Sequence, residues 1–150
     1  LSFMETEKRT ISPLAFKLGI AGLIPFVVLA LLNFAAESSY KNIISFSLLA
    51  YGASICSFLG AIHWGLTMRD KTPDNIYLIW GVVPSLIAWV SLMIKPEFGL
   101  LLITALLWIC LFIDSKIYPK YLLAHWLPMR LSLTIIASIA CLISAYNQLM

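Results

Sequence analysis

Charged residues are scarce in this chain of 150 residues: Asp, Glu, Lys and Arg together make up 11%, whereas about 25% is usual in soluble domains. Residues of the apolar set make up 61%. A soluble domain of this size leaves about a third of its surface exposed to water and needs polar side chains to cover it. The scarcity of charge therefore excludes a soluble monomer and predicts that lipid covers much of the surface.

Recognisable catalytic and metal-binding motifs are also lacking. The chain contains no G-x-S-x-G, H-E-x-x-H or Walker pattern. Cys56, Cys110 and Cys141 stand apart, without the C-x-x-C spacing of redox and zinc sites, and nothing in the sequence sets His63 opposite His125 as a haem-ligand pair. We therefore expect no metal and no cofactor, and an enzyme is the less favoured interpretation.

Long stretches without charge are what the sequence has in abundance. Five of them are close to the roughly 20 residues that a helix needs to cross a bilayer. We predict an all-α fold, a polytopic integral membrane protein with a single bundle of five transmembrane helices at about residues 13–33, 42–67, 75–94, 96–113 and 129–147. Residues 1–12 are expected to form a cytoplasmic N-terminal segment, and residues 13–150 one transmembrane domain. A cleaved secretory signal within residues 1–36 is the disfavoured alternative, because no A-x-A-like site follows the apolar run.

The few basic residues predict the orientation. Eight of the ten fall on the side of the N-terminus: Lys8, Arg9, Lys17, Arg69, Lys71, Lys116, Lys120 and Arg130. Only Lys41 and Lys95 fall on the other side. Short cytoplasmic loops carry the excess of Lys and Arg, so we expect a bacterial inner membrane with a cytoplasmic N-terminus and a periplasmic C-terminus, or the mitochondrial inner membrane in a eukaryote. Topology thus accounts for the net charge, and the expected partner is the lipid bilayer, with no nucleic acid.

Small residues recur every fourth position along the second predicted helix, in two adjacent rows. Rows of this kind let helix backbones approach closely inside lipid. The favoured interpretation is packing within this chain, with the second helix at the centre of the bundle; the alternative is a seam for a second copy or another membrane protein. The two rows are Gly52, Cys56 and Gly60, and Ala53, Ser57, Ala61 and Gly65.

Polar side chains gather at the predicted cytoplasmic ends of the second, fourth and fifth helices. His63 and Trp64 lie near the end of the second helix, Asp114 ends the fourth, and His125 and Arg130 flank the start of the fifth. An ionisable residue at membrane depth is a candidate functional residue. The favoured interpretation is an Asp114–Arg130 ion pair that joins two helices. The alternative is a vestibule for an anionic group such as a lipid head.

Two prolines lie inside predicted spans, Pro25 in the first and Pro84 in the third. Each lacks a backbone N–H and is expected to kink its helix. Broken helices occur at transporter sites, but fitting of helix shape within the bundle is the favoured interpretation.

Five motifs together resemble the transmembrane protein 69-like family of uncharacterised bacterial and mitochondrial membrane proteins. They are Gly22-Leu-Ile-Pro-Phe26, Tyr51-Gly-Ala, Ser57-Phe-Leu-Gly-Ala-Ile-His-Trp-Gly65, Pro84-Ser-Leu-Ile-Ala-Trp89 and Arg130-Leu-Ser-Leu-Thr134. The family has no established activity, so the resemblance implies a compact inner-membrane bundle and no particular chemistry.

The expected function is therefore that of a small integral inner-membrane protein of unknown molecular activity, with a scaffold or assembly role as the leading hypothesis. The alternative is a small transporter or lipid-handling protein that uses the polar site of His63, Trp64, Asp114 and Arg130. The two differ in what the interior should hold. A scaffold predicts a filled interior and an exposed seam of small residues, whereas a transporter predicts a water-accessible cavity that reaches past His63.

Overall fold

The computed structural model describes residues 9–150, and in that part of the chain the secondary structure is entirely helical. The predicted all-α polytopic bundle is confirmed. Residues 1–8 of the predicted N-terminal segment, Lys8 included, lie outside the described residues. The elements in order are α1 (Pro13–Ala21), α2 (Ile24–Ala35), α3 (Ser38–Thr67), α4 (Asn75–Ser91), α5 (Pro96–Ile117), the short 3₁₀ helices η1 (Tyr118–Tyr121) and η2 (Ala124–Trp126), and α6 (Leu127–Leu149).

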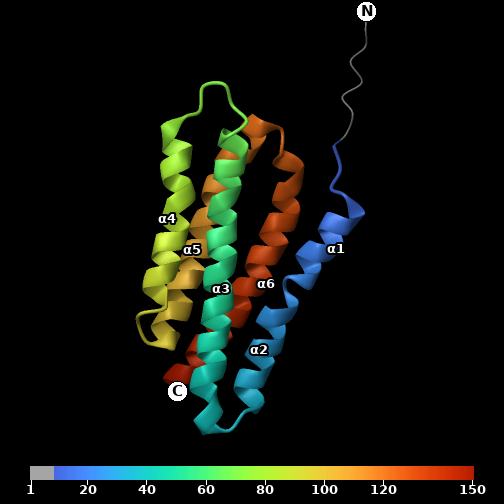
Figure 1. The fold of residues 1–150 in the computed structure, drawn as a ribbon. Coiled ribbons are helices and arrows are strands. Elements are labelled where there is room, and N and C mark those ends of the chain that lie inside the picture. The colour runs from blue at the N-terminus through green and yellow to red at the C-terminus, as the bar shows by residue number, and fades with distance from the viewer. Residues whose placement is uncertain (1–8) are drawn as a thin grey trace, which may run out of the picture.

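The longest helix, α3, occupies the middle of the bundle (Figure 1) and packs against α2, α4, α5 and α6. Its partners bring large apolar side chains to one continuous core, in which Leu48 and Leu49 of α3 and Leu100 and Ile103 of α5 are fully buried. Because hydrophobicity alone does not drive helices together in lipid, this close packing is what gives the bundle its shape.

Among residues 9–150, four helical segments are long and apolar enough to cross a membrane: Pro13–Ala35, Ser38–Thr67, Pro96–Tyr121 and Ala124–Leu149. The remaining segment, α4, has 17 residues and spans about 25 Å at 1.5 Å per residue, slightly less than the roughly 30 Å hydrocarbon core of a bilayer. The predicted span 75–94 was three residues too long, because the chain turns after Ser91 toward the next helix.

The boundary of the predicted span 96–113 also needs correction, since α5 continues to Ile117. The prediction ended the helix at the first charged residue, Asp114, but this carboxylate is paired inside the protein and the helix passes through it. The predicted spans 42–67 and 129–147 were likewise slightly short, because α3 begins at Ser38 and α6 at Leu127.

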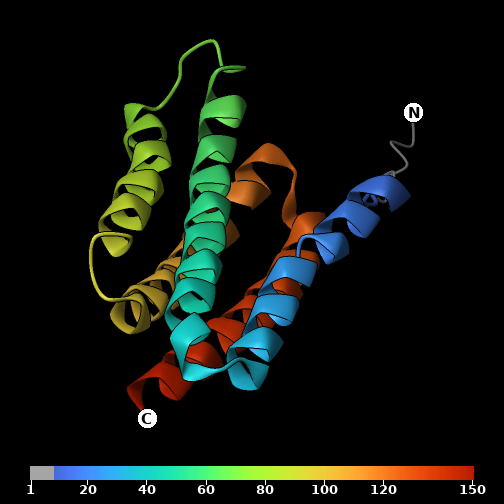
Figure 2. The same ribbon diagram turned by 60° about the horizontal axis from the view of Figure 1, so that its bottom comes forward.

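The first predicted span is interrupted, because α1 ends at Ala21 and α2 begins at Ile24. Pro25 lies in the first turn of α2, where its missing N–H costs no helical bond. The interruption frees the carbonyl of Gly22, which accepts a hydrogen bond of 2.7 Å from the Tyr51 hydroxyl of α3. Beyond this point α1 leans away from α3 and contacts α6 (Figures 1 and 2). Pro84, by contrast, lies within a continuous α4.

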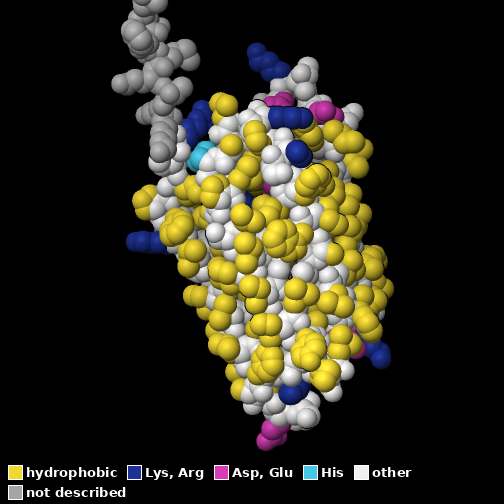
Figure 3. All heavy atoms as spheres, turned by 180° about the vertical axis from the view of Figure 1, so that it is seen from behind, with side chains coloured by type: hydrophobic (Ala, Val, Ile, Leu, Met, Phe, Trp, Pro, Cys, Tyr) yellow, Lys and Arg dark blue, Asp and Glu magenta, His cyan; other side chains and the backbone are white. Residues whose placement is uncertain are grey.

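Apolar side chains cover the flank of the bundle, and most charged side chains lie toward its two ends (Figure 3). Leu31 of α2 and Phe58 of α3, for example, are each more than half exposed. An apolar surface of this extent needs lipid around it, which agrees with a membrane location.

Candidate functional site

A buried ionic cluster joins three helices near the end of the bundle where α3 and α5 finish and α6 begins. His63 of α3, Asp114 of α5 and Arg130 of α6 are only 1%, 1% and 7% exposed. The Nε2 of His63 lies 2.7 Å from Oδ1 of Asp114, and Nη2 of Arg130 donates to Oδ2 of Asp114, also at 2.7 Å. The structure thus brings together three of the four predicted site residues.

The hydrogen bonds within this cluster define its charge. An ionised carboxylate can only accept, so His63 donates from Nε2 and Arg130 from Nη2. The Nδ1 of His63 is buried without a partner among residues 9–150. The charges of Asp114 and Arg130 neutralise one another, as a buried ion pair requires. Through its hydrogen bonds the cluster links α3, α5 and α6.

Trp64 and His125 do not belong to the cluster. The exposed indole of Trp64 donates to the Leu78 carbonyl of α4 at 2.9 Å. The ring of His125 lies beside Trp126 in η2. Of the four residues of the alternative vestibule, His63, Asp114, His125 and Arg130, only Arg130 lines the pocket described below.

Tyr118 is part of this region although the sequence did not single it out. It begins η1, is buried, and its ring centroid lies 6.4 Å from that of His63. Thr67, which is also buried, donates its hydroxyl to the backbone carbonyl of His63 at 2.6 Å within α3. The sequence could have pointed to both residues, because each lies about one helical turn after a residue of the cluster. Tyr118 follows Asp114, and Thr67 follows His63.

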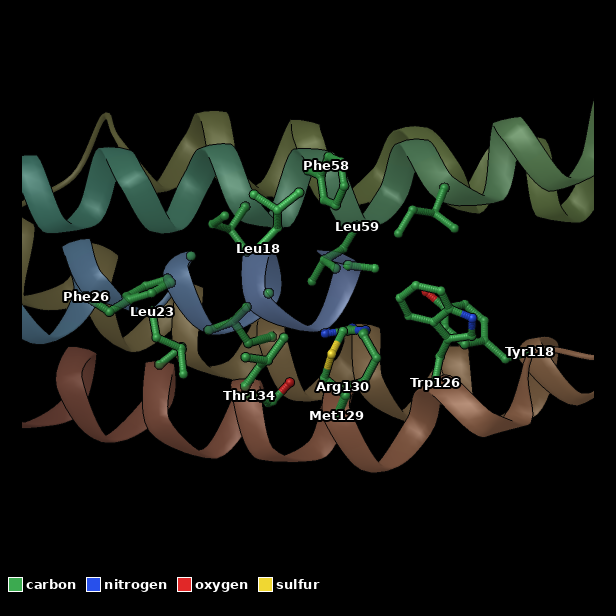
Figure 4. Close-up of a pocket in the computed structure, with 18 of the residues that line it drawn as sticks. Leu18, Leu23, Phe26, Phe58, Leu59, Tyr118, Trp126, Met129, Arg130 and Thr134 are labelled. Carbon is green, nitrogen blue, oxygen red and sulfur yellow. The ribbon is translucent and has the colours of Figure 1, made fainter. Parts of the chain in front are cut away.

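An apolar pocket of about 560 Å³ lies between α1, α3 and α6, directly beside the cluster (Figure 4). Arg130 lies midway along it, with Phe26 toward one end and Trp126 toward the other. Leu18 and Phe58 line the pocket and are nevertheless more than half exposed. The pocket therefore opens through the apolar flank of the bundle. The full lining is Ala15, Leu18, Gly19, Gly22, Leu23, Phe26, Ile55, Phe58, Leu59, Ile62, Leu107, Tyr118, Leu123, Trp126, Met129, Arg130, Leu133, Thr134 and Ala137.

The outward lean of α1 makes room for this pocket. Gly22 and Leu23, where the first helical segment is interrupted, both line it. A continuous helix from Pro13 to Ala35 would remove the bend between α1 and α2. The hydrogen bond from Tyr51 to Gly22 holds the bend in place, so this tyrosine supports the pocket without lining it.

The first row of small residues packs within the chain. A Cβ at Gly60 would lie 2.6 Å from the Gly81 carbonyl of α4, and one at Gly52 would lie 2.8 Å from Ile103 of α5. Cys56 between them is fully buried. Helices α4 and α5 therefore pack directly against this row of small residues.

The second row turns outward along its length. Ala53 is buried, Ser57 is half-buried, and Ala61 and Gly65 are exposed. At Gly65, a Cβ would meet no heavy atom within 4 Å in the described part of the chain.

A second buried polar cluster, at the opposite end of the bundle, was missed by the sequence analysis. The amide of Asn33 in α2 donates to Ser45 of α3 at 2.6 Å and accepts from Asn147 of α6 at 2.6 Å. Asn33 is fully buried. A lone Asn within an apolar run was the available signal, because buried amides in membranes need partners on neighbouring helices.

The described residues contain no group of three or more His, Cys, Asp or Glu side chains that could hold a metal ion. The cluster offers only His63 and Asp114 as ligand types, and Asp114 is already engaged by Arg130. The chemistry of this site is thus hydrogen bonding beside an apolar cavity.

A family model described as "Protein of unknown function (DUF3429)" matches residues 11–146, which includes every element from α1 to α5 and most of α6. The chain belongs to this family. The predicted resemblance to the transmembrane protein 69-like family is confirmed by two curated relatives. "Transmembrane protein 69" of Xenopus tropicalis is 35% identical over 140 residues, which cover 89% of this chain and 54% of the relative.

"Transmembrane protein 69" of Mus musculus is 28% identical over 133 residues, covering 87% of this chain and 53% of the relative. The chain therefore spans about half the length of the curated relatives that it matches. No solved structure matches it. The family and the apolar helices together show a membrane protein of unknown activity.

Proposed function

We propose that this protein handles lipid, by holding a long apolar chain in the pocket between α1, α3 and α6. The observation that carries the proposal is the pocket itself, with its apolar lining and its opening through the lipid-facing flank at Leu18 and Phe58. Its volume of about 560 Å³ falls within the roughly 300–1,000 Å³ of small-molecule sites. Lipid chains are the most abundant apolar molecules at that opening.

The polar cluster supports lipid handling over aqueous transport. A path for a hydrated solute needs polar side chains along it, whereas this pocket is lined mainly by hydrocarbon. His63 is buried against Asp114 and does not line the pocket. Of the three residues of the cluster, only Arg130 lines the pocket.

The scaffold role has weaker support. It rests on Ala61 and Gly65, the two members of the small-residue rows of α3 that are exposed. The remaining glycines of α3, Gly52 and Gly60, are already occupied by α5 and α4. The small-residue surface of α3 that is left for a partner protein is therefore confined to the last turns of the helix.

The proposed location is the bacterial inner membrane, or the mitochondrial inner membrane in a eukaryote, with the N-terminus on the cytoplasmic or matrix side. Basic residues support this orientation: Arg69 and Lys71 follow α3 and Lys120 lies in η1, at one end of the bundle, while Lys41 and Lys95 lie at the other. Labelling of single engineered cysteines in sealed membrane vesicles tests it. A cysteine at position 71 should be protected in right-side-out vesicles, and one at position 95 should be labelled; the reverse pattern contradicts the orientation.

The test of lipid binding uses two matched leucines of α1. Leu18 lines the pocket and Leu14, one turn earlier, does not, although they are 63% and 64% exposed. Leu18→Trp should fill the mouth of the pocket, whereas Leu14→Trp should only change the lipid-facing surface. The protein purified in mild detergent is examined by native mass spectrometry for one retained lipid per chain.

We expect wild type and Leu14→Trp to retain this lipid equally, and Leu18→Trp to lose most of it. Equal retention by both variants would show that the retained lipid sits elsewhere. No retained lipid in the wild type, after reconstitution with native membrane lipids, would overturn the proposed function.

A further inference from the structure

We infer that the pocket selects a ligand with a neutral carbonyl oxygen on its long apolar chain, and that Arg130 and Thr134 donate hydrogen bonds to that oxygen. This inference rests on the proposed function and specifies the chemical class of its ligand. Both side chains line the pocket, and each has a buried polar atom that lacks a partner within residues 9–150: Nε of Arg130 and Oγ1 of Thr134.

The two donors lie where one ligand atom can reach both. Arg130 and Thr134 are four residues apart on α6, so their side chains lie on the same face of the helix, one turn apart. Figure 4 shows both side chains from α6 inside the pocket. Arg130 is 7% exposed and Thr134 is 1% exposed, so water at the surface of the molecule does not satisfy them.

An unpartnered buried donor is costly, because it has lost its water without gaining a replacement. Nη2 of Arg130 donates to Asp114, which fixes the guanidinium, and the buried Nε has no partner in the described residues. An acceptor oxygen in the pocket would satisfy Nε and the Thr134 hydroxyl together. The surrounding hydrocarbon from Leu133, Met129 and Leu18 would hold the chain that carries it.

The charge of the cluster favours a neutral acceptor over a carboxylate or phosphate. Asp114 already neutralises the single charge of Arg130. A second anion in the pocket would leave a buried negative charge without a counter-ion, which is strongly unfavourable in an apolar site. A carbonyl oxygen accepts the same hydrogen bonds without that penalty. Ester-linked lipids carry such an oxygen at the head of a long apolar chain, and isoprenoid quinones carry it on the ring to which the chain is attached.

The experiment measures displacement of radiolabelled methyl palmitate from the purified protein in mild detergent. Three competitors of similar length separate the possibilities: unlabelled methyl palmitate has a neutral carbonyl, palmitate has a carboxylate, and octadecane has no acceptor. Methyl palmitate should compete about three- to tenfold better than octadecane, the contribution expected of one or two hydrogen bonds. Dipalmitoyl phosphatidylcholine and decylubiquinone, added as further competitors, tell which source of carbonyl is preferred.

Two hydroxyls of α6 provide a matched pair of variants. Thr134 and Ser138 are one turn apart, both are buried without a partner in the described residues, and only Thr134 lines the pocket. Thr134→Val keeps the shape of the side chain and removes its hydroxyl. It should reduce the preference for methyl palmitate over octadecane, with the Arg130 donor still in place, whereas Ser138→Ala should leave the preference unchanged.

The outcomes separate this inference from the proposed function. If octadecane competes as well as methyl palmitate, or if Thr134→Val keeps the full preference, the carbonyl is not recognised, although the pocket still holds a chain. If palmitate competes best, the site takes an anion and the inference is wrong. If no competitor displaces the label and no saturable binding is found, the proposed function itself fails.

Discussion

Removing the negative charge of Asp114 should destabilise the bundle more than any other single loss of charge. In Asp114→Asn the side chain keeps its size, but Arg130 loses its counter-ion and His63 loses its strongest acceptor. Both partners are at least nine-tenths buried and both contacts measure 2.7 Å, so water does not replace the carboxylate.

The size of the effect follows from this burial. Breaking a buried ion pair by removal of one partner costs about 3–5 kcal/mol, a large part of the roughly 5–15 kcal/mol that stabilises a typical domain. Asp70→Asn is the matched control, since Asp70 is exposed and accepts a hydrogen bond from Tyr121 at 2.7 Å. An exposed charge contributes about 0–1 kcal/mol, so this variant should unfold almost as the wild type does.

Unfolding in mixed micelles of dodecyl maltoside and SDS, followed by circular dichroism, measures both variants. A double-mutant cycle then isolates the pair: Asp114→Leu with Arg130→Met removes both charges and should cost less than the sum of the single changes, by about 2 kcal/mol or more. If the costs add within about 0.5 kcal/mol, or if Asp114→Asn is as mild as Asp70→Asn, the cluster does not hold the helices together.

Other predictions test the packing around the pocket. Gly60→Leu should lower the free energy of unfolding by more than about 2 kcal/mol, because its Cβ would lie 2.6 Å from the Gly81 carbonyl. The control, Gly65→Leu, should change the free energy of unfolding by less than about 0.5 kcal/mol. Equal changes for the two variants in the same SDS titration would contradict this contact between α3 and α4. Tyr51→Phe leaves the Gly22 carbonyl without its donor and should cost about 1–3 kcal/mol. It should also weaken lipid retention in native mass spectrometry, and unchanged retention would show that the bend does not depend on this bond.

The fold was largely predictable because its signal is spread over many residues. Long charge-free stretches determine where helices can cross lipid, and the prediction of five of them needed no knowledge of contacts. The errors fell where tertiary structure overrides the local pattern. Asp114 lies inside α5 instead of ending it, because Arg130 and His63, 16 and 51 residues away in sequence, supply its partners.

The candidate site was predictable in part. His63, Asp114 and Arg130 were identified because ionisable residues are conspicuous in an apolar chain, and the Asp114–Arg130 pair was expected. Trp64 was included through its neighbour His63, but a helix turns by about 100° per residue, so Trp64 faces α4. The pocket was not predictable, because it depends on the bend at Gly22 and on the lean of α1, and its lining of leucine and phenylalanine resembles any other lipid-facing surface.

The most direct test of the central claim is a crystal structure of the protein grown in a lipidic phase that contains lipid with brominated acyl chains. The account predicts an anomalous bromine signal inside the pocket between α1, α3 and α6, beside Arg130 and Thr134, which is absent from Leu18→Trp. Bromine signal confined to the outer flank of the bundle, with the pocket empty or filled by protein side chains, would contradict it.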